Sequence, residues 1–334
     1  MTKVNALITV PQPLRDLILT PEALARLQGF AHVTMNEDGR DWKAEEIAVR
    51  LPGVDVLITG WGIARLTADV LARADRLRLI AHSAGSVKGF VTDAVFDKGI
   101  ALTHAAPRIA DSVAEYTLLA ALMGLRRLHE LDRRMRSGEP WPKTRTMPHY
   151  EIRGKKVGLL GMGYVGRRTA QLFQAVGAEV WAYDPYLSPE RAVELGVRKA
   201  GLHELLRACQ IISIHLPVTD ETHHLLGAEE LCLIGDGAVF INSARAWTVD
   251  QEAMIKELST GRFWAALDVF DPEPLPAVHP LRTMENVLLT PHVAGLTRDS
   301  YQDLMAWVIE ETERFFRGEP LQYPITREML ATMA

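Results

Sequence analysis

The chain has 334 residues, of which 48% are hydrophobic, and a formal net charge of −5. This length and composition are typical of a globular protein with two domains. The sequence has no dense block of lysine and arginine, so its charge does not indicate nucleic-acid binding. Its two cysteines, Cys209 and Cys232, lie in separate apolar stretches and indicate neither a disulfide framework nor a metal site.

The N-terminal segment lacks the length and the small-residue cleavage site of a signal peptide. Its pattern predicts a first strand instead. The longest apolar helix candidate, Tyr116–Leu125, is far shorter than the ~20 residues of a membrane span. We therefore expect no contact with membranes and a location in the reducing cytoplasm.

The first part of the chain alternates between segments with strand patterns and segments with helix patterns. The predicted strands are Ala6–Val10, His32–Met35, Val54–Thr59, Leu79–His82 and Ala101–Thr103. The predicted helices between them are Pro21–Leu27, Trp42–Arg50, Ala68–Ala72 and Thr92–Lys98. This alternation predicts a parallel α/β unit of about five strands.

A long helix is predicted next, over Ser112–Arg136. Ser112 is followed three residues later by Glu115, which is the pattern of a capping box with Ser112 as N-cap. Residues 137–147 contain a glycine and two prolines and predict a loop.

The alternation then resumes in a second unit. Its predicted strands are Val157–Leu160, Glu179–Tyr183, Val197–Lys199, Ile211–His215, Ala238–Asn242, Ala265–Val269 and Val287–Leu289. Its predicted helices are Arg167–Val176, one from Leu202, one near Glu229, and Asp250–Ser259, and a last helix, Ser300–Arg317, follows the unit. We predict that residues 110–296 form a domain inserted into a discontinuous domain of residues 1–109 and 297–334.

The segment that narrows the function most follows the predicted strand Val157–Leu160. It reads Gly161-Met-Gly163-Tyr-Val-Gly166, continues as a helix, and leads to a second strand that ends at Asp184. Asp184 lies 18 positions beyond Gly166, close to the roughly 20 expected in dinucleotide-binding folds. A glycine-rich turn that binds nothing is the alternative, and the strand, helix and acid together disfavour it.

Each part of this fingerprint has a physical role in holding a dinucleotide. Gly161 allows the tight turn, Gly163 lets the backbone approach the pyrophosphate, and Gly166 lets helix and strand pack closely. The phosphates would bind backbone amides at the helix N-terminus, where Tyr164 and Val165 lie.

Asp184 also favours one cofactor over another. A carboxylate accepts hydrogen bonds from the ribose 2′-hydroxyl, whereas it repels a 2′-phosphate. The residues that follow, Pro185-Tyr-Leu187, include no arginine that could bind that phosphate. The sequence therefore predicts NAD rather than NADP.

Three polar residues each follow a predicted strand: Arg245, Glu273 and His292. Parallel sheets bind ligands at the carboxyl ends of their strands. Reduction of a carbonyl needs a proton donor, which histidine supplies near neutral pH, and a neighbouring carboxylate would stabilise the imidazolium and fix its tautomer. An arginine can bind a substrate carboxylate through two parallel hydrogen bonds. Surface arginines and glutamates are common, and a single loop histidine is more often structural than catalytic. Only the occurrence of all three after successive strands indicates catalysis.

Six motifs follow one another between residues 112 and 292. They are Ser112-Val-Ala-Glu-Tyr116, the glycine fingerprint with Tyr183-Asp-Pro185, His215-Leu-Pro217, Asn242-Ser-Ala-Arg245, Asp268-Val-Phe-Asp-Pro-Glu-Pro274 and Thr290-Pro-His292. Together they resemble the D-isomer-specific 2-hydroxyacid dehydrogenase family. The resemblance implies two Rossmann-like or flavodoxin-like parallel-sheet domains, with an NAD-binding domain inserted into the substrate-binding domain.

The resemblance also implies roles for residues. Arg245 would bind the substrate, His292 would be the acid/base, and Glu273 would be its acidic partner. The further cofactor contacts implied by the matching motifs are Ser112, Leu216, Pro217, Ala244 and Asp268, with Asp268 at the nicotinamide carboxamide. The implied substrate is a small 2-oxo or 2-hydroxy acid, and the implied assembly is a homodimer formed through the Ser112–Arg136 region.

The chain departs from the family pattern on the substrate side. The family has a Gly-x-Gly-x-Asp-Asn-like loop, where this chain has Ser83-Ala-Gly-Ser-Val-Lys88. The backbone amides of Ala84, Gly85 and Ser86 can still bind a carboxylate. Trp61 and Trp247 are equally compatible with packing and with substrate contact.

Other functions are also compatible with parts of the sequence. Some relatives of the family act as NAD-sensing corepressors, and formate dehydrogenases share the fold but have glutamine at the position of Glu273. A methyltransferase using S-adenosylmethionine is disfavoured because Arg245, Glu273 and His292 have no role in methyl transfer. Glyoxylate, hydroxypyruvate, a phenylpyruvate-like acid and larger acids all remain open as substrates.

Overall fold

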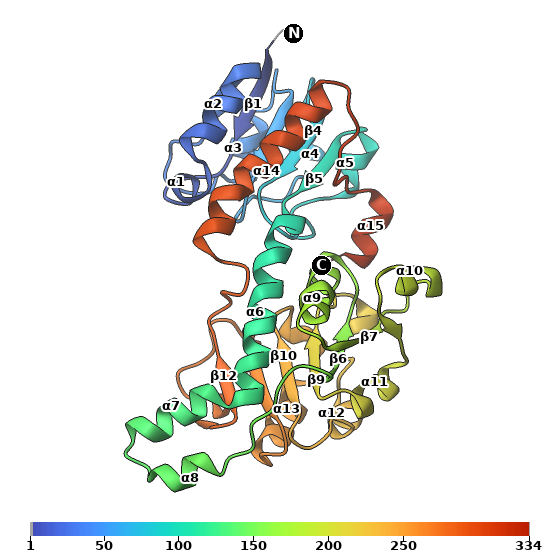
Figure 1. Ribbon diagram of the computed structural model, residues 1–334. Coiled ribbons are helices and arrows are strands. Elements are labelled where there is room, and N and C mark those ends of the chain that lie inside the picture. The colour runs from blue at the N-terminus through green and yellow to red at the C-terminus, as the bar shows by residue number, and fades with distance from the viewer. Residues whose placement is uncertain (1–2, 334) are drawn as a thin grey trace. The chain divides into compact units, whose positions relative to one another are not determined.

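The computed structural model describes residues 3–333 and divides into two compact units (Figure 1). One unit comprises Met1–Ile109 together with Leu296–Ala334, and the other comprises Ala110–Gly295. Both contain a fully parallel sheet flanked by helices, so the predicted α/β class with one domain inserted into the other is confirmed.

The first unit is a five-stranded sheet with the strand order β2-β1-β3-β4-β5. Its strands are β1 (Val4–Ile8), β2 (Ala31–Met35), β3 (Val56–Thr59), β4 (Leu79–His82) and β5 (Ala101–His104). Its helices are α1 (Leu14–Ile18), α2 (Pro21–Phe30), α3 (Ala44–Ala48), α4 (Ala68–Leu71), α5 (Asp93–Asp97), α14 (Arg298–Phe316) and α15 (Arg327–Thr332). All residues of β3 and β4 are buried, as expected for central strands covered on both faces.

The last long helix, α14, supplies part of the core of the first unit. Its buried side chains Leu304, Met305, Val308 and Ile309 recur at helical spacing and pack with residues of β1, β3 and β4. The buried carboxylate of Glu311 then accepts the backbone amides of Gln322 (2.9 Å) and Tyr323 (3.0 Å). These contacts fix the segment after α14 against the same sheet.

The second unit is a seven-stranded sheet with the order β12-β11-β10-β9-β6-β7-β8. Its strands are β6 (Lys156–Leu160), β7 (Glu179–Tyr183), β8 (Arg198–Lys199), β9 (Ile211–Ile214), β10 (Val239–Asn242), β11 (Trp264–Leu267) and β12 (Val287–Leu289). Its helices are α6 (Ala106–Arg126, which starts in the first unit), α7 (Leu128–Arg136), α8 (Trp141–Arg145), α9 (Tyr164–Ala175), α10 (Pro189–Glu194), α11 (Leu202–Ala208), α12 (Ala228–Cys232) and α13 (Gln251–Ser259). Short 3-10 turns lie at Asp220–Thr222, Ala246–Thr248 and Pro280–Thr283. The strand order reverses between β6 and β9, which is where such sheets bind ligands.

The single helix predicted over Ser112–Arg136 is wrong at its start and in its continuity. Helix α6 begins at Ala106, so Ser112 is buried in its interior and cannot be its N-cap. The helix ends at Arg126, and the next residue, Arg127, has a left-handed φ of 52°. Buried Glu130 then forms ion pairs with Arg127 (3.6 Å) and Arg134 (2.8 Å) and stabilises the start of α7.

Smaller elements were also missed. The predicted loop over residues 137–147 contains the short helix α8, and α1, α10 and α15 have too few residues for a clear periodic pattern. Tertiary packing rather than local propensity stabilises helices of this length.

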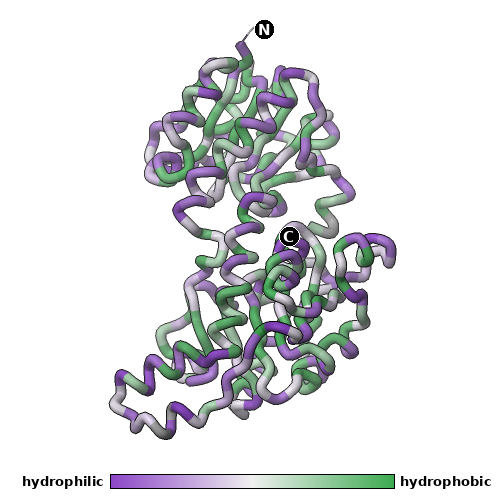
Figure 2. Tube along the Cα trace, in the orientation of Figure 1, coloured by the Kyte–Doolittle hydropathy of each residue, from purple (hydrophilic) through white to green (hydrophobic). Residues whose placement is uncertain are grey.

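Hydrophobic residues gather along the strands of each unit, whereas the outer helices carry many hydrophilic residues (Figure 2). Within the described part of the chain, no helix combines the length and the apolar character that a membrane span needs. The location in the cytoplasm stays a prediction.

Candidate active site

The glycine fingerprint forms the turn between β6 and α9. Gly161 has a φ of 96°, and a side chain there would put its Cβ 2.6 Å from the carbonyl oxygen of His215. A Cβ at Gly166 would collide with the carbonyl of Gly161. Both positions therefore need glycine, whereas a Cβ at Gly163 would meet only open space. The turn thus leaves room for a ligand at the N-terminus of α9.

Asp184 lies beside this turn. One of its carboxylate oxygens accepts the backbone N–H of Met162 (2.8 Å), and the other accepts that of Tyr186 (2.8 Å). The carboxylate at the end of β7 is thus held next to the fingerprint, where a dinucleotide ribose would lie.

The end of β9 completes the same edge of the sheet. The backbone N–H of His215 donates to the carbonyl of Leu160 (2.7 Å), so Leu216 and Pro217 follow directly beside the fingerprint turn. Ser112 is buried on α6, and its neighbour Asp111 forms an ion pair with Arg168 of α9 (2.6 Å). The open turn, the helix N-terminus and the acid fit a dinucleotide.

His292 and Glu273 meet at the carboxyl ends of β12 and β11. The Nδ1–H of His292 donates to one oxygen of Glu273 (2.9 Å), and the other oxygen accepts the amide of Phe270 (2.9 Å). His292 has a left-handed φ of 54°, an uncommon conformation for a residue with a side chain. Their side chains are 49% and 38% exposed, so the pair is accessible to a small molecule.

Arg245 follows β10, and its charge interacts with that of Glu273. Its Nη1 donates to the carbonyl of Ala244 (2.6 Å), while Asn242 accepts the amide of Ala244 and donates to the carbonyl of Arg245 (3.1 Å each). Burial lowers the pKa of the Arg245 guanidinium, and the charge of Glu273 opposes that effect. The structure therefore brings Arg245, Glu273 and His292 together within the second unit.

Several influences set the charge of Glu273. Burial is the largest and raises the pKa of the carboxyl. The hydrogen bond from His292, the amide of Phe270 and the charges of His292 and Arg245 act in the other direction. Together they outweigh burial, so the pKa of Glu273 is lowered and the group is a carboxylate near neutral pH.

Asp268 holds the loop that carries His292. Its buried carboxylate accepts the hydroxyl of Thr290 (2.6 Å) and the amides of Val293 (2.9 Å) and Ala294 (2.9 Å). Because the Thr290 hydroxyl donates to Asp268, it can accept the hydroxyl of Tyr116 from α6 (2.6 Å). The loop is thus fixed on both sides of His292.

Sequence reasoning assigned no role to Tyr116 or Thr290, although both lie in the motifs that it singled out. Burial raises the pKa of Tyr116 to about 12, so its hydroxyl stays protonated and able to donate. Their contact joins residues 174 positions apart, which no local pattern could reveal.

The two tryptophans considered as substrate contacts are each partly packed. Trp61 is 38% exposed and lies edge-on to Tyr301, with ring centroids 6.0 Å apart. Trp247 is 46% exposed and lies against the ring of His223, 4.3 Å between centroids. Packing explains part of each ring and leaves another part exposed.

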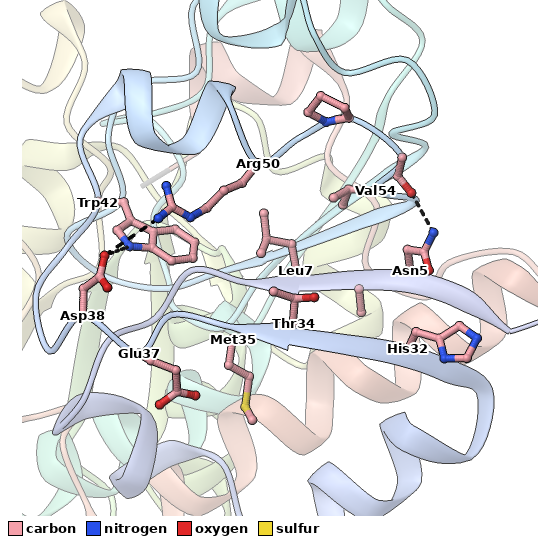
Figure 3. Close-up of a pocket in the computed structure, with 13 residues that line it drawn as sticks. Asn5, Leu7, His32, Thr34, Met35, Glu37, Asp38, Trp42, Arg50 and Val54 are labelled. Atoms are coloured by element: carbon pink, nitrogen blue, oxygen red, sulfur yellow. Dashed lines mark hydrogen bonds and ion pairs between the residues drawn. The ribbon is translucent and has the colours of Figure 1, made fainter.

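A cavity of about 420 Å³ lies elsewhere, over β1 and β2 of the first unit (Figure 3). Its charged side chains are already engaged, since Asp38 accepts Trp42 Nε1 (2.7 Å) and lies 4.0 Å from Arg50. None of the predicted site residues lines it. Across residues 3–333 we find no group of three or more His, Cys, Asp or Glu side chains able to hold a metal ion.

Comparison with known proteins identifies the class of this fold and site. A sequence model described as "D-isomer specific 2-hydroxyacid dehydrogenase, NAD binding domain" matches residues 118–294. The chain belongs to this family and is an NAD-dependent oxidoreductase.

Relatives with related names agree with this assignment. The chain is 34% identical over 319 residues to glyoxylate reductase of Aeropyrum pernix, covering 93% of this chain and 94% of that one. It is 32% identical over 277 residues to D-3-phosphoglycerate dehydrogenase of Methanocaldococcus jannaschii, covering 82% of this chain but only 52% of that relative. The crystal structure of a phosphoglycerate oxidoreductase from Rhizobium etli superposes with a TM-score of 0.84 at 27% identity, covering 98% and 99% of the two chains.

Proposed function

We propose that the protein interconverts a small 2-oxo acid and the corresponding D-2-hydroxy acid, with Arg245, Glu273 and His292 as its reaction centre. The observation that carries the proposal is the hydrogen bond between His292 Nδ1 and the Glu273 carboxylate. The positive charge of Arg245 also interacts with this carboxylate. The glutamate also favours this reaction over formate oxidation, because a carboxylate supports proton exchange at the imidazole.

We assign cofactor binding to residues 110–296 and substrate binding mainly to residues 1–109 with 297–334. The cofactor would be held by the turn of Gly161, Gly163 and Gly166 and by Asp184. The other proposed contacts are Ser112, Tyr164, Val165, Leu216, Pro217, Ala244 and Asp268. NADH bound there supplies the hydride for the substrate carbonyl carbon.

The chain's own groups bind the substrate and move the proton. Arg245 binds the substrate carboxylate and polarises the neighbouring carbonyl oxygen. Because His292 Nδ1 donates to Glu273, Nε2 is the atom that exchanges a proton with the substrate. The charged imidazole gives its Nε2 proton to the developing alkoxide and becomes neutral, and it takes the proton back in the oxidation direction. The amides of Ala84, Gly85 and Ser86 are the proposed second anchor for the carboxylate.

The acid/base role of His292 is tested by His292→Ala. Loss of the proton donor should reduce kcat for 2-oxo acid reduction by a factor on the order of 10²–10⁴. The Kd for NADH, measured by fluorescence titration, should change little because His292 is not a proposed cofactor contact. His279→Ala, at another histidine of the second unit, is the control. Full turnover of the His292 variant would overturn the assignment.

Among the open substrates we propose glyoxylate first. The relative named glyoxylate reductase is matched over 94% of its length, whereas the phosphoglycerate dehydrogenase is matched over about half. A panel of glyoxylate, hydroxypyruvate and phenylpyruvate, followed by NADH absorbance, tests the choice. A kcat/KM for glyoxylate below those of the larger acids would reject it.

We also propose that the protein is a homodimer formed through α6 and α7. These helices expose Leu119 (55%), Leu122 (37%), Leu128 (50%) and Met135 (45%), which would be costly to leave in water. Leu119→Glu should convert the dimer to a monomer in sedimentation velocity. Leu17→Glu, at a similarly exposed leucine of α1 (56%), should not. A monomeric unsubstituted protein would refute the proposal.

A further inference from the structure

The loop that carries Glu273 has little backbone structure of its own. In residues 269–276 three prolines lack an N–H, and within the described part of the chain these residues form no hydrogen bond from backbone to backbone. The carbonyls of the last two residues of the loop accept hydrogen bonds from Nη2 and Nε of Arg282 (2.7 and 2.8 Å). The part of the loop before Glu273 needs another support.

Gln251 holds this earlier part of the loop. It is the first residue of α13, and its Nε2 donates to the carbonyl of Asp271 (2.7 Å) while its Oε1 accepts the Asp271 amide (3.3 Å). The cap of this helix is the preceding residue, Asp250, whose carboxylate accepts the amide of Ala253 (3.1 Å). The side-chain amide of Gln251 therefore bonds both backbone groups of Asp271, as a neighbouring strand would.

The contact is transmitted to the proposed acid/base pair in two short steps. The residue before Asp271 is Phe270, whose amide donates to one oxygen of Glu273 (2.9 Å). The other oxygen of that carboxylate accepts the Nδ1–H of His292 (2.9 Å). A displacement of Asp271 would therefore turn the Glu273 carboxylate and weaken its hydrogen bond to His292.

The segment that ends at Gln251 also carries Arg245. Its backbone is fixed where the carbonyl of Arg245 accepts Asn242 Nδ2 (3.1 Å) and the Thr248 hydroxyl (2.9 Å). Because Gln251 lies three residues beyond Thr248, its side chain ties the loop of Glu273 to this fixed segment. The proposed catalytic groups thereby keep their spacing.

We propose that Gln251 is a positioning residue for the reaction. Its side-chain amide holds the Glu273 carboxylate where that carboxylate selects an Nδ1–H on His292, which leaves Nε2 to exchange the proton with the substrate. This inference rests on the proposed function, in which His292 is the acid/base.

Kinetics of matched variants test the proposal. Gln251→Met keeps the length of the side chain and removes both hydrogen bonds, and water can replace them because Asp271 is exposed. The kcat for glyoxylate reduction should fall about tenfold, as for the loss of two hydrogen bonds, while KM for NADH stays nearly constant. Gln174→Met is the control, because Gln174 makes two similar bonds elsewhere in the second unit, to the carbonyls of Leu195 and Gly196 (2.9 Å each). Its kcat should be unchanged.

A conservative variant grades the effect. Gln251→Glu can still accept the amide of Asp271, but it has no N–H to donate to the Asp271 carbonyl. Its kcat should lie between those of the unsubstituted protein and of Gln251→Met. A kcat no higher than that of Gln251→Met would count against the role of these hydrogen bonds.

A spectroscopic measurement separates this inference from the proposed function. Protein labelled with ¹⁵N-histidine is held at about pH 9, where an ordinary imidazole is neutral, and the Nδ1 resonance of His292 is assigned by its loss in His292→Ala. In the unsubstituted protein and in Gln174→Met the chemical shift should be that of an N–H. In Gln251→Met it should move toward that of an unprotonated nitrogen, because the bond that selects the tautomer is weakened. If no 2-oxo acid is reduced but this pattern holds, the proposed function fails and the positioning role stands.

Two results would overturn the positioning role. One is an unchanged kcat together with an unchanged His292 resonance in folded Gln251→Met. The other is an equal loss of kcat in Gln174→Met, which would trace the loss to weaker folding instead of to the loop. If Gln251→Met does not fold, Gln251→Glu replaces it, and an unchanged kcat and His292 resonance in that variant would overturn the role.

Discussion

Backbone amides hold two carboxylates of this protein in place. Asp184 accepts two amides and Asp268 accepts two amides and a hydroxyl. Hydrogen bonds to a carboxylate stabilise its charged form and restrict its rotation. A small number of acids can therefore hold both the cofactor turn and the loop of His292 in place.

The charge of Asp184 leads to a prediction about cofactor choice. The unsubstituted protein should have a kcat/KM for NADH at least about tenfold above that for NADPH, because the carboxylate repels the 2′-phosphate. Asp184→Asn keeps an oxygen for the amide of Met162 but removes the charge, so the preference should shrink. Absorbance assays with both cofactors measure it, with Glu221→Gln as a nearby charge-removing control. Equal kcat/KM values for the two cofactors in the unsubstituted protein would contradict the prediction.

At the scale of elements, a link between α6 and the end of β12 positions His292, the proposed acid/base. The Tyr116 hydroxyl reaches Thr290, which in turn donates to Asp268. The loop between Thr290 and Ala294 holds His292 in a left-handed conformation that costs energy and needs such support.

This link predicts a graded set of variants. Thr290→Val removes both hydrogen bonds of the hydroxyl and should lower kcat about tenfold or more, whereas Tyr116→Phe removes one and should have a smaller effect. KM for NADH should stay nearly constant in both. Thr290→Ser, which keeps the hydroxyl, should restore most of kcat. Stopped-flow and steady-state assays measure these values, and a fully active Thr290→Val would show that the link has no role.

The elements also show how far the sequence can predict the structure. Arg245, Glu273 and His292 could be grouped because each follows a strand, and parallel strands end at one edge of a sheet. The Tyr116–Thr290 contact could not, because it depends on where α6 packs. The break at Arg127 was missed because neither a glycine nor a proline marks it in the sequence.

A pair of buried histidines in the first unit likewise could not be predicted from the sequence. His82 and His104 were unremarkable in the sequence, where each simply ends an apolar strand. The strand register places them side by side, which no local pattern could predict.

At the scale of the whole molecule, buried neutral histidines affect stability. Burial lowers the pKa of His82 to about 3, and it does the same for His215. In the unfolded chain both bind a proton below about pH 6.5. The stability that they contribute as neutral groups is therefore present above pH 6.5 and is lost as the pH falls toward 3.

Unfolding in urea should reveal this dependence. Between pH 7 and pH 5 the free energy of unfolding should fall by on the order of 2 kcal/mol for each of the two rings. His82→Gln, which has no titrating group, should make the dependence shallower. Circular dichroism provides the measurement, and a free energy of unfolding that stays constant from pH 7 to pH 5 would disprove the prediction.

The position of α14 has a consequence for synthesis. Ribosomes make the sheet of the first unit before the whole second unit, and α14 with its four core side chains comes after both. At 5–20 residues per second, the interval between Ile109 and α14 is roughly 10–40 s. During that time the second unit can complete its core, while one face of the N-terminal sheet is covered only in part, by α1 and α2, until α14 is made. The part of the protein made first is therefore finished last.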